Sequence, residues 1–283
     1  MVVRILMLPG YTQNATSGRI GGLRRALKDT AELVFIDPPH IVNMPTTDAN
    51  KFDSDASAAP TSEADTPRAW WFAERSESFR TFKQYEETLV YLRGILEKQQ
   101  FDGIFGFSQG AACAAILTAL CENPQLDPVF AKPNEDPNVT WPPPPFKFAI
   151  LSAGFFPLDP RTAALFDKPL STPTLHVLGR ADTIVGEERS VPLTKVFDDA
   201  RVEWHDGGES LYFRAVFSRF CHHTPSKASW RRFFQSYMEA FDENGGGKAA
   251  ALALPSPSAS NDADTPNASG TSTPIPVDAH GKL

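Results

Sequence analysis

The pentapeptide Gly106-Phe107-Ser108-Gln109-Gly110 has the residue types and the spacing of a serine nucleophile. An apolar stretch precedes it and a run of small residues follows, so the pattern predicts a strand, a sharp turn and a helix. The two glycines allow a turn too tight for Cβ atoms, which strains the serine backbone and lifts its hydroxyl above the sheet edge. We therefore predict Ser108 as a nucleophile, with an ordinary strand–turn–helix corner as the alternative.

The amides around this turn predict an oxyanion site. The helix after Ser108 would point its N-terminal N–H groups at the developing charge, and the first donor would be the backbone N–H of Gln109. The second donor would come from the turn after the first strand, where we nominate the backbone N–H of Tyr11. The alternative for residues 9–14 is a plain turn between a strand and a helix.

A serine hydroxyl is a weak nucleophile at neutral pH and needs a base, usually histidine, with an acid that orients the base. In folds that carry this strand–serine turn–helix motif, the three residues follow along the chain in the order serine, acid, histidine. Asp182 leaves a buried apolar strand that ends at Gly179, and we nominate it as the acid. An aspartate in such a turn is also a common capping residue, which is the alternative.

The base is harder to choose among six histidines. His40 and His280 lie before a long polar loop and in a polar tail, and His176 is in the middle of a predicted strand. His205 ends the last predicted strand, whereas the adjacent His222 and His223 precede the final helix, where the base is expected. Neighbours in a loop usually point in different directions, so at most one of the pair is the base. No third or fourth ligand stands at useful spacing, so we predict no metal.

Composition limits the classes of function. The chain has 283 residues, 41% of them hydrophobic, and a formal net charge of −7 without a densely basic stretch. We therefore expect one sizeable core and neither nucleic acid nor an anionic membrane as a partner. No apolar run approaches the ~20 residues of a membrane span, and the N-terminus lacks the features of a secretory signal. Three sparse cysteines, Cys113, Cys121 and Cys221, favour reduced thiols in the cytoplasm.

The predicted elements place these residues on an α/β fold. Strands are expected at 2–8, 32–37, 101–107, 146–154, 173–179 and 201–205, and helices from 17, at 82–99, after 108 and at 226–241. Alternating strands and helices predict a mostly parallel sheet covered on both faces. We expect one domain over residues 1–243 with a polar surface loop at 41–66, and a disordered tail over 244–283. The adjacent Trp70 and Trp71 would either line an acyl pocket or cover the core.

These motifs together resemble the FSH family of serine hydrolases, which have the α/β-hydrolase fold. The resemblance rests on residues 9–14, 67–72, 106–110, 176–185 and 225–230, and it covers roughly residues 2–242. It implies a triad of Ser108, Asp182 and a histidine after Gly207-Gly208, and hydrolysis of a carboxylic ester or thioester without a cofactor. The family includes esterases and thioesterases that release polyketides, which implies a polyketide synthase as a partner. Pro9 stands where the family usually has histidine.

One segment departs from the family pattern. Members typically read Gly-Gly-His, two residues and Pro, whereas here Glu209–Cys221 separates Gly207-Gly208 from the histidines. Removing this segment restores the pattern and puts His222 at the family position. The atypical insertion at 209–221 is therefore either a retained intron or an aromatic lid beside the site. The codons of Gly208-Glu209-Ser210 allow a splice-donor-like string, whereas the acceptor side is weaker.

We predict a serine hydrolase that acts on a small-molecule ester or acyl thioester, with Ser108, Asp182 and His222 as its triad. The alternative is a non-catalytic ligand-binding homologue on the same scaffold, in which the insertion displaces the histidine.

Overall fold

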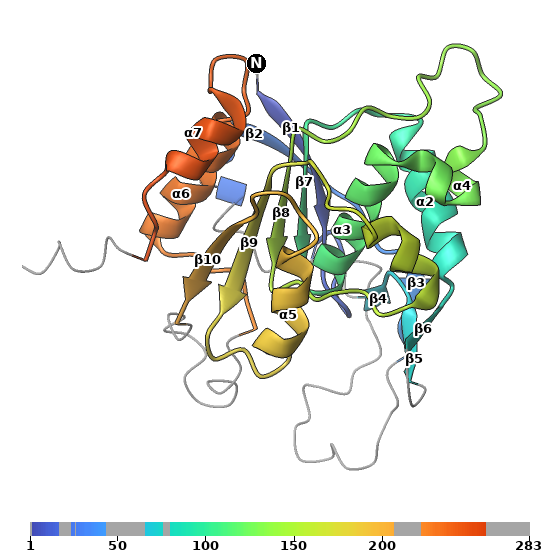
Figure 1. Cartoon of the computed structure of the whole chain (residues 1–283), viewed down its shortest axis with the longest axis horizontal. Helices are drawn as coiled ribbons and strands as arrows, with labels where there is room; N and C mark the ends of the chain where they lie inside the picture. The colour runs from blue at the N-terminus through green and yellow to red at the C-terminus, as the bar shows by residue number, and fades with distance from the viewer. Residues whose placement is uncertain are drawn as a thin grey trace, which may run out of the picture.

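A parallel sheet with helices on both faces organises the computed structural model of the chain (Figure 1). The structure describes residues 2–16, 24–25, 27–43, 66–75, 80–206 and 222–258. Within these residues six strands form the sheet in the order β10-β9-β8-β7-β1-β2. Every neighbouring pair in it is parallel. The prediction of a mostly parallel α/β fold is confirmed.

The six strands are β1 (Val3–Leu8), β2 (Ala31–Phe35), β7 (Gly103–Phe107), β8 (Phe148–Ser152), β9 (Thr174–Gly179) and β10 (Arg201–His205). Short antiparallel pairs form from β3 (His40–Ile41) with β4 (Arg68–Ala69), and from β5 (Phe72–Arg75) with β6 (Arg80–Lys83). The helices are α2 (Tyr85–Leu96), α3 (Gln109–Glu122), α4 (Pro128–Ala131), α5 (Glu187–Thr194), α6 (Ala228–Glu239) and α7 (Gly247–Ala253). Two 3-10 helices, η3 (Pro124–Leu126) and η4 (Pro160–Phe166), complete the described elements.

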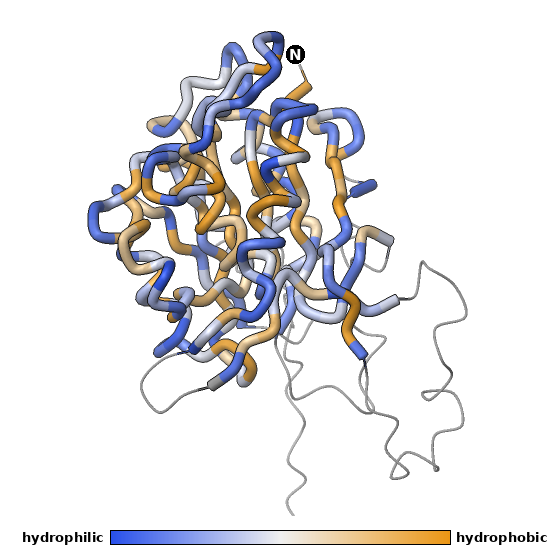
Figure 2. Tube along the Cα trace, turned by 90° about the vertical axis from the view of Figure 1, so that its right-hand side faces the viewer, coloured by the Kyte–Doolittle hydropathy of each residue, from blue (hydrophilic) through white to orange (hydrophobic). Residues whose placement is uncertain are grey.

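Alternation along the strands divides the core into two layers. In β1, Leu6 and Leu8 belong to a cluster with α2 and α3, whereas Ile5 and Met7 belong to a cluster with α6. Successive side chains of a strand point to opposite faces, so one strand supplies both layers. Figure 2 shows the hydrophobic positions concentrated along these central strands. Because both faces are covered, the strands read as nearly continuous apolar runs in the sequence.

The region before α2 differs from the prediction. Residues 82–99 were expected to form one helix, but α2 starts at Tyr85, and β6 pairs with β5 just before it. Gln84 adopts a left-handed conformation with φ of 61°, which separates the strand from the helix. The polar loop expected at 41–66 lies mostly outside the described residues, as does the insertion at 209–221. In the described part of the chain no helix is long and apolar enough to cross a membrane.

The expectation of disorder from residue 244 is corrected for residues 247–253, which form α7 beside α6 (Figure 1). Ala251 is buried against the α6 side of the core. The Arg201 guanidinium fixes the C-terminal end of α7 by donating to the backbone oxygens of Ala251 and Leu254 at 2.6 and 2.7 Å. It also pairs with Glu203 at 2.7 Å, and both side chains are 9% exposed. Alanine makes up most of this segment, and Leu252 is its one large apolar residue, so its sequence resembles a solvated tail.

We predict that Arg201→Met destabilises the fold by about 3 kcal/mol, because it leaves the Glu203 carboxylate buried without its partner. Urea unfolding measures the change. The double variant with Arg201→Met and Glu203→Gln should lose less unfolding free energy than the sum of the losses in the two single variants. Additive losses would contradict a coupled pair.

Candidate active site

The turn between β7 and α3 is strained at Ser108, which has φ of 54° and ψ of −118°. Its N–H donates to the Ser152 backbone oxygen at 2.9 Å, which ties the turn to β8. A Cβ at Gly106 would overlap the backbone of Gly110, and a Cβ at Gly110 would overlap the carbonyl oxygen of Leu8. Both glycines are therefore needed for the close approach of α3 to the strands, and this approach projects the Ser108 side chain from the sheet edge.

Ser108, His222 and Asp182 form a continuous hydrogen-bonded line. The Ser108 hydroxyl lies 2.8 Å from His222 Nε2, and Asp182 Oδ2 lies 2.8 Å from His222 Nδ1. A carboxylate only accepts hydrogen bonds, so Nδ1–H donates to Asp182 and leaves Nε2 to accept from the hydroxyl. The structure thus brings together three residues that are widely separated in the sequence, in the geometry expected of a nucleophile, base and acid.

The Asp182 carboxylate is fixed by its own turn after β9. Its Oδ1 accepts from the backbone N–H groups of Ile184 and Val185, both at 2.9 Å. Burial raises the pKa of this carboxyl, but hydrogen bonds from His222 and the two amides outweigh burial and hold the pKa below its usual value. The carboxylate therefore stays ionised at neutral pH, as an acid that orients an imidazole must.

The other described histidines lie apart from Ser108. His223, the second base candidate, packs its ring against His205 with centroids 5.0 Å apart. Burial lowers the pKa of His205 to about 4 and that of His176 to about 3, so both are neutral core groups. Of the adjacent pair, His222 is the residue that reaches Ser108. Among the described residues no group of three or more histidine, cysteine or acidic side chains is arranged to hold a metal.

The proposed oxyanion amides belong to the first residue of α3 and to the loop after β1. Gln109 is the first residue of α3, so its N–H has no acceptor within the helix. The loop after β1 is held by Thr12 N–H, which donates to the Arg68 carbonyl at 2.8 Å, and by Gly10 N–H, which donates to the Gln13 side chain at 3.0 Å. Across the described chain the Tyr11 N–H has no acceptor, so it is available to a ligand.

The Gln109 side chain has a positioning role that the sequence did not reveal. Its Oε1 accepts from Trp70 N–H at 3.0 Å, and its Nε2 donates to the Trp71 carbonyl at 2.8 Å. The Trp70 indole in turn donates to the Pro9 carbonyl at 2.8 Å. These bonds connect the start of α3 to the loop after β1. They support that loop at Pro9, the position where the family usually has histidine. Both Trp70 and Trp71 are buried in the core, and Trp71 also lines the cavity.

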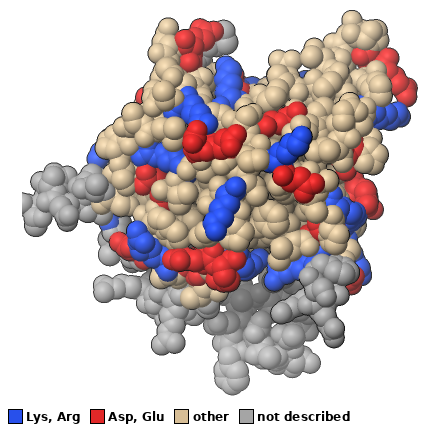
Figure 3. All heavy atoms as spheres, in the orientation of Figure 1, with Lys and Arg blue, Asp and Glu red and all other residues tan. Residues whose placement is uncertain are grey.

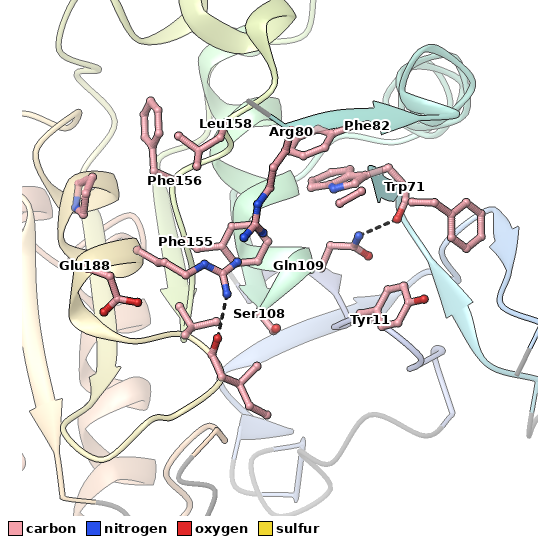
Figure 4. Close-up of a pocket in the computed structure, with 16 residues that line it drawn as sticks. Tyr11, Trp71, Arg80, Phe82, Ser108, Gln109, Phe155, Phe156, Leu158 and Glu188 are labelled. Atoms are coloured by element: carbon pink, nitrogen blue, oxygen red, sulfur yellow. Dashed lines mark hydrogen bonds between the residues drawn. The ribbon is translucent and has the colours of Figure 1, made fainter. Parts of the chain in front are cut away.

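A cavity of about 440 Å³ opens onto Ser108, Gln109 and Tyr11 (Figure 4). Its described walls are mainly aromatic and apolar, with three charged side chains. The lining residues outside the predicted motifs are Ala73, Arg80, Phe82, Phe155, Phe156, Leu158, Glu188, Arg189 and Pro192. Sequence reasoning missed this set because it comes from β5, β6, α5 and the loop after β8, which carry no recognisable motif. On the face shown in Figure 3, positive and negative side chains are interspersed.

The parallel sheet, the strained serine turn and the histidine–aspartate pair are the features of an α/β-hydrolase. The chain belongs to the family described as Serine hydrolase (FSH1), which matches residues 1–216. Curated relatives include Esterase OVCA2 of Danio rerio, 34% identical over 84% of this chain and 97% of the relative. Esterase OVCA2 of Homo sapiens is 32% identical over 85% of this chain and 97% of the relative.

Comparison with solved structures supports the fold alone. The crystal structure of Arabidopsis thaliana SOBER1 has a TM-score of 0.51 and 15% sequence identity, and the match covers 85% of this chain and 99% of that protein. The family match ends at residue 216, inside the atypical insertion and before His222. Glu209–Cys221 lies outside the described residues, so the choice between a retained intron and a lid stays a prediction for transcript sequencing.

We predict that His222→Ala lowers kcat by at least about 10³-fold, because it removes the only imidazole in contact with the Ser108 hydroxyl among the described residues. His223→Ala is the matched control and should leave kcat within about 3-fold. Steady-state ester hydrolysis measures both. A larger loss in His223→Ala than in His222→Ala would contradict the geometry.

We also predict a pH-dependent contribution of Asp182 to stability. Its folded-state pKa is lowered, so the stabilisation is present above the unfolded-state pKa, about 4, and is lost as pH falls through the folded value. The difference in unfolding free energy between wild type and Asp182→Asn should therefore shrink below about pH 4. Urea unfolding at several pH values measures it. A difference that grows with acidity would be inconsistent with the lowered pKa.

Proposed function

We propose that this family member hydrolyses a carboxylic ester or thioester through an acyl-enzyme on Ser108. The hydrogen-bonded line of Ser108, His222 and Asp182 carries the proposal, because it holds a hydroxyl, a base and an ionised acid at 2.8 Å spacings. The neighbouring cavity offers room for an acyl group beside Gln109 and Tyr11, whose backbone N–H groups have no acceptor among the described residues. The esterase names of the curated relatives agree with this class of reaction.

In the first half-reaction Ser108 Oγ attacks the acyl carbon while its proton passes to His222 Nε2. The carbonyl oxygen becomes an oxyanion that accepts hydrogen bonds from the Gln109 and Tyr11 amides. When the intermediate collapses, the bond from the acyl carbon to the leaving oxygen or sulfur breaks. His222 gives its proton to that atom, and the acyl group stays on Ser108.

In the second half-reaction a water molecule attacks the acyl carbon and gives its proton to His222. Collapse breaks the bond to Ser108 Oγ, which takes the proton back, and releases a carboxylic acid. Throughout, Asp182 keeps the imidazole in one tautomer and stabilises its protonated form. No cofactor takes part in this sequence.

The family resemblance suggests a biological setting within this proposal. If the acyl group arrives as a thioester, a polyketide synthase in secondary metabolism is the partner that the resemblance implies. A reducing compartment, which we propose to be the cytoplasm, suits Cys113 and Cys121, which are buried and unpaired.

We predict that a fluorophosphonate probe labels the wild-type protein and that Ser108→Ala abolishes the labelling. The same variant should lower kcat for a 4-nitrophenyl ester by at least about 10³-fold. The exposed Ser226 provides a matched control, and Ser226→Ala should label normally.

The rival proposal is a non-catalytic ligand-binding homologue. It requires a displaced histidine, whereas His222 lies within hydrogen-bond distance of Ser108. A folded wild-type protein that neither reacts with the probe nor hydrolyses esters would favour that rival.

A further inference from the structure

Two arginines stand in a cavity that is otherwise mainly apolar. Arg80 comes from β6 and Arg189 from α5, and both line the same space as Ser108. Backbone hydrogen bonds connect both arginines to the loop after β8. The Arg189 carbonyl oxygen accepts from the Phe156 N–H at 3.0 Å, and the Arg80 backbone N–H donates to the Leu158 carbonyl oxygen at 3.5 Å. The two cations are therefore built into the wall of the cavity.

Among the described residues the Arg80 guanidinium makes no hydrogen bond or ion pair. The Arg161 guanidinium, in contrast, pairs with Glu86 and Asp159 and donates to the Phe82 carbonyl. Figure 4 shows the Arg80 side chain extending from the strand toward the centre of the cavity, above Ser108. A guanidinium presents five N–H donors in a fixed fork that matches a carboxylate. Its direction and its free donors point to an anionic ligand.

Arg189 reinforces the positive character of the cavity. One of its N–H groups donates to the Ile184 carbonyl at 2.8 Å, and its guanidinium stacks on the Phe155 ring with 4.6 Å to the centroid. Burial and the positive charge of Arg80 lower the Arg189 pKa, and the negative charges of Glu188 and Asp182 only partly oppose this. Among the described lining residues Glu188 is the only carboxylate, and it is exposed to solvent. Within the described lining, two cations therefore accompany one solvated anion.

Like charges in a partly buried apolar space are unfavourable unless an anion compensates them. The position of the cavity suggests which part of a substrate carries that anion. Ser108 and both proposed oxyanion residues line the cavity, whereas His222, which must face the leaving group, is not among the described lining residues. The cavity therefore lies on the acyl side of the scissile bond.

We propose that the cavity binds an acyl group with an apolar chain and a terminal carboxylate, and that Arg80 receives this carboxylate with Arg189 as the second cation. The aromatic wall would cover the methylene chain, and the arginines would bind its far end. The inference rests on the proposed esterase function and narrows its substrates to half-esters or half-thioesters of dicarboxylic acids. The cavity volume, about 440 Å³, is within the range of small-molecule sites.

The test compares two esters with the same leaving group and the same number of acyl carbons, mono-4-nitrophenyl adipate and 4-nitrophenyl hexanoate. We expect wild-type kcat/KM to be at least about 10-fold higher for the adipate half-ester, because a charge-assisted hydrogen bond contributes about that factor. Arg80→Met should remove this preference while hexanoate hydrolysis stays within about 3-fold, and Arg80→Lys should restore part of it. Lys83→Met is the matched control, because Lys83 is an exposed cation on the same strand that pairs with Glu74.

Equal wild-type rates for both esters, or an Arg80→Met variant that loses both activities equally, would overturn the inference. The inference would also be overturned if the wild type, but not Arg80→Met, preferred hexanoyl-coenzyme A to hexanoyl-N-acetylcysteamine and showed no preference for the adipate half-ester. That result would place the anion on the leaving group.

A binding measurement separates failure of this inference from failure of the proposed function. Calorimetry with Ser108→Ala should show tighter binding of adipate than of hexanoate, whether or not the wild-type enzyme turns over either ester. Tighter adipate binding without turnover would refute the esterase proposal and retain the carboxylate site. Turnover of both esters with equal binding of the two acids would refute the carboxylate site alone. The same measurement decides the inference if Arg80→Met does not fold.

Discussion

The close contact between the start of helix α3 and the ends of strands β1 and β7 is the constraint on which the site depends. It is possible only because Gly106 and Gly110 lack side chains, and it forces Ser108 into a strained conformation. The same contact brings the Gln109 amide and the loop after β1 to one place. The Gln109 side chain then holds the Trp70–Trp71 backbone, and the Trp70 indole holds the β1 loop. Packing of backbone on backbone therefore fixes the proposed nucleophile and both proposed oxyanion donors before any substrate arrives.

The sequence predicted the central sheet, and it nominated Ser108 and Asp182, because these rest on local signals. Buried parallel strands are read as apolar runs, and their boundaries at 3–8, 174–179 and 201–205 agree with the expected ones to within a residue. The serine turn has a motif, and Asp182 follows a strand in the expected order. The sequence left open whether His222 or His223 is the base, with the family resemblance favouring His222. In the structure His222 makes contacts of 2.8 Å with both Ser108 and Asp182.

The features that the sequence did not predict are those that depend on distant partners. Helix α7 is held by Arg201, far away in the sequence, and its small side chains give no amphipathic signal. The β5–β6 hairpin interrupts a helical pattern, because Gln84 adopts a left-handed conformation that no residue type announces. Arg80 and Arg189 line the same cavity from two elements that carry no motif. Cavity walls are assembled from loops of different strands, so their chemistry is visible only once the chain is folded.

The central claim is that Ser108 carries the acyl group during turnover. Acid quenching of the wild-type protein during hydrolysis of a 4-nitrophenyl ester, followed by peptide mass spectrometry, tests it most directly. The account predicts an acyl adduct on the peptide that contains Ser108, and on that residue. Rapid turnover with no covalent adduct, or an adduct on a different side chain, would contradict it.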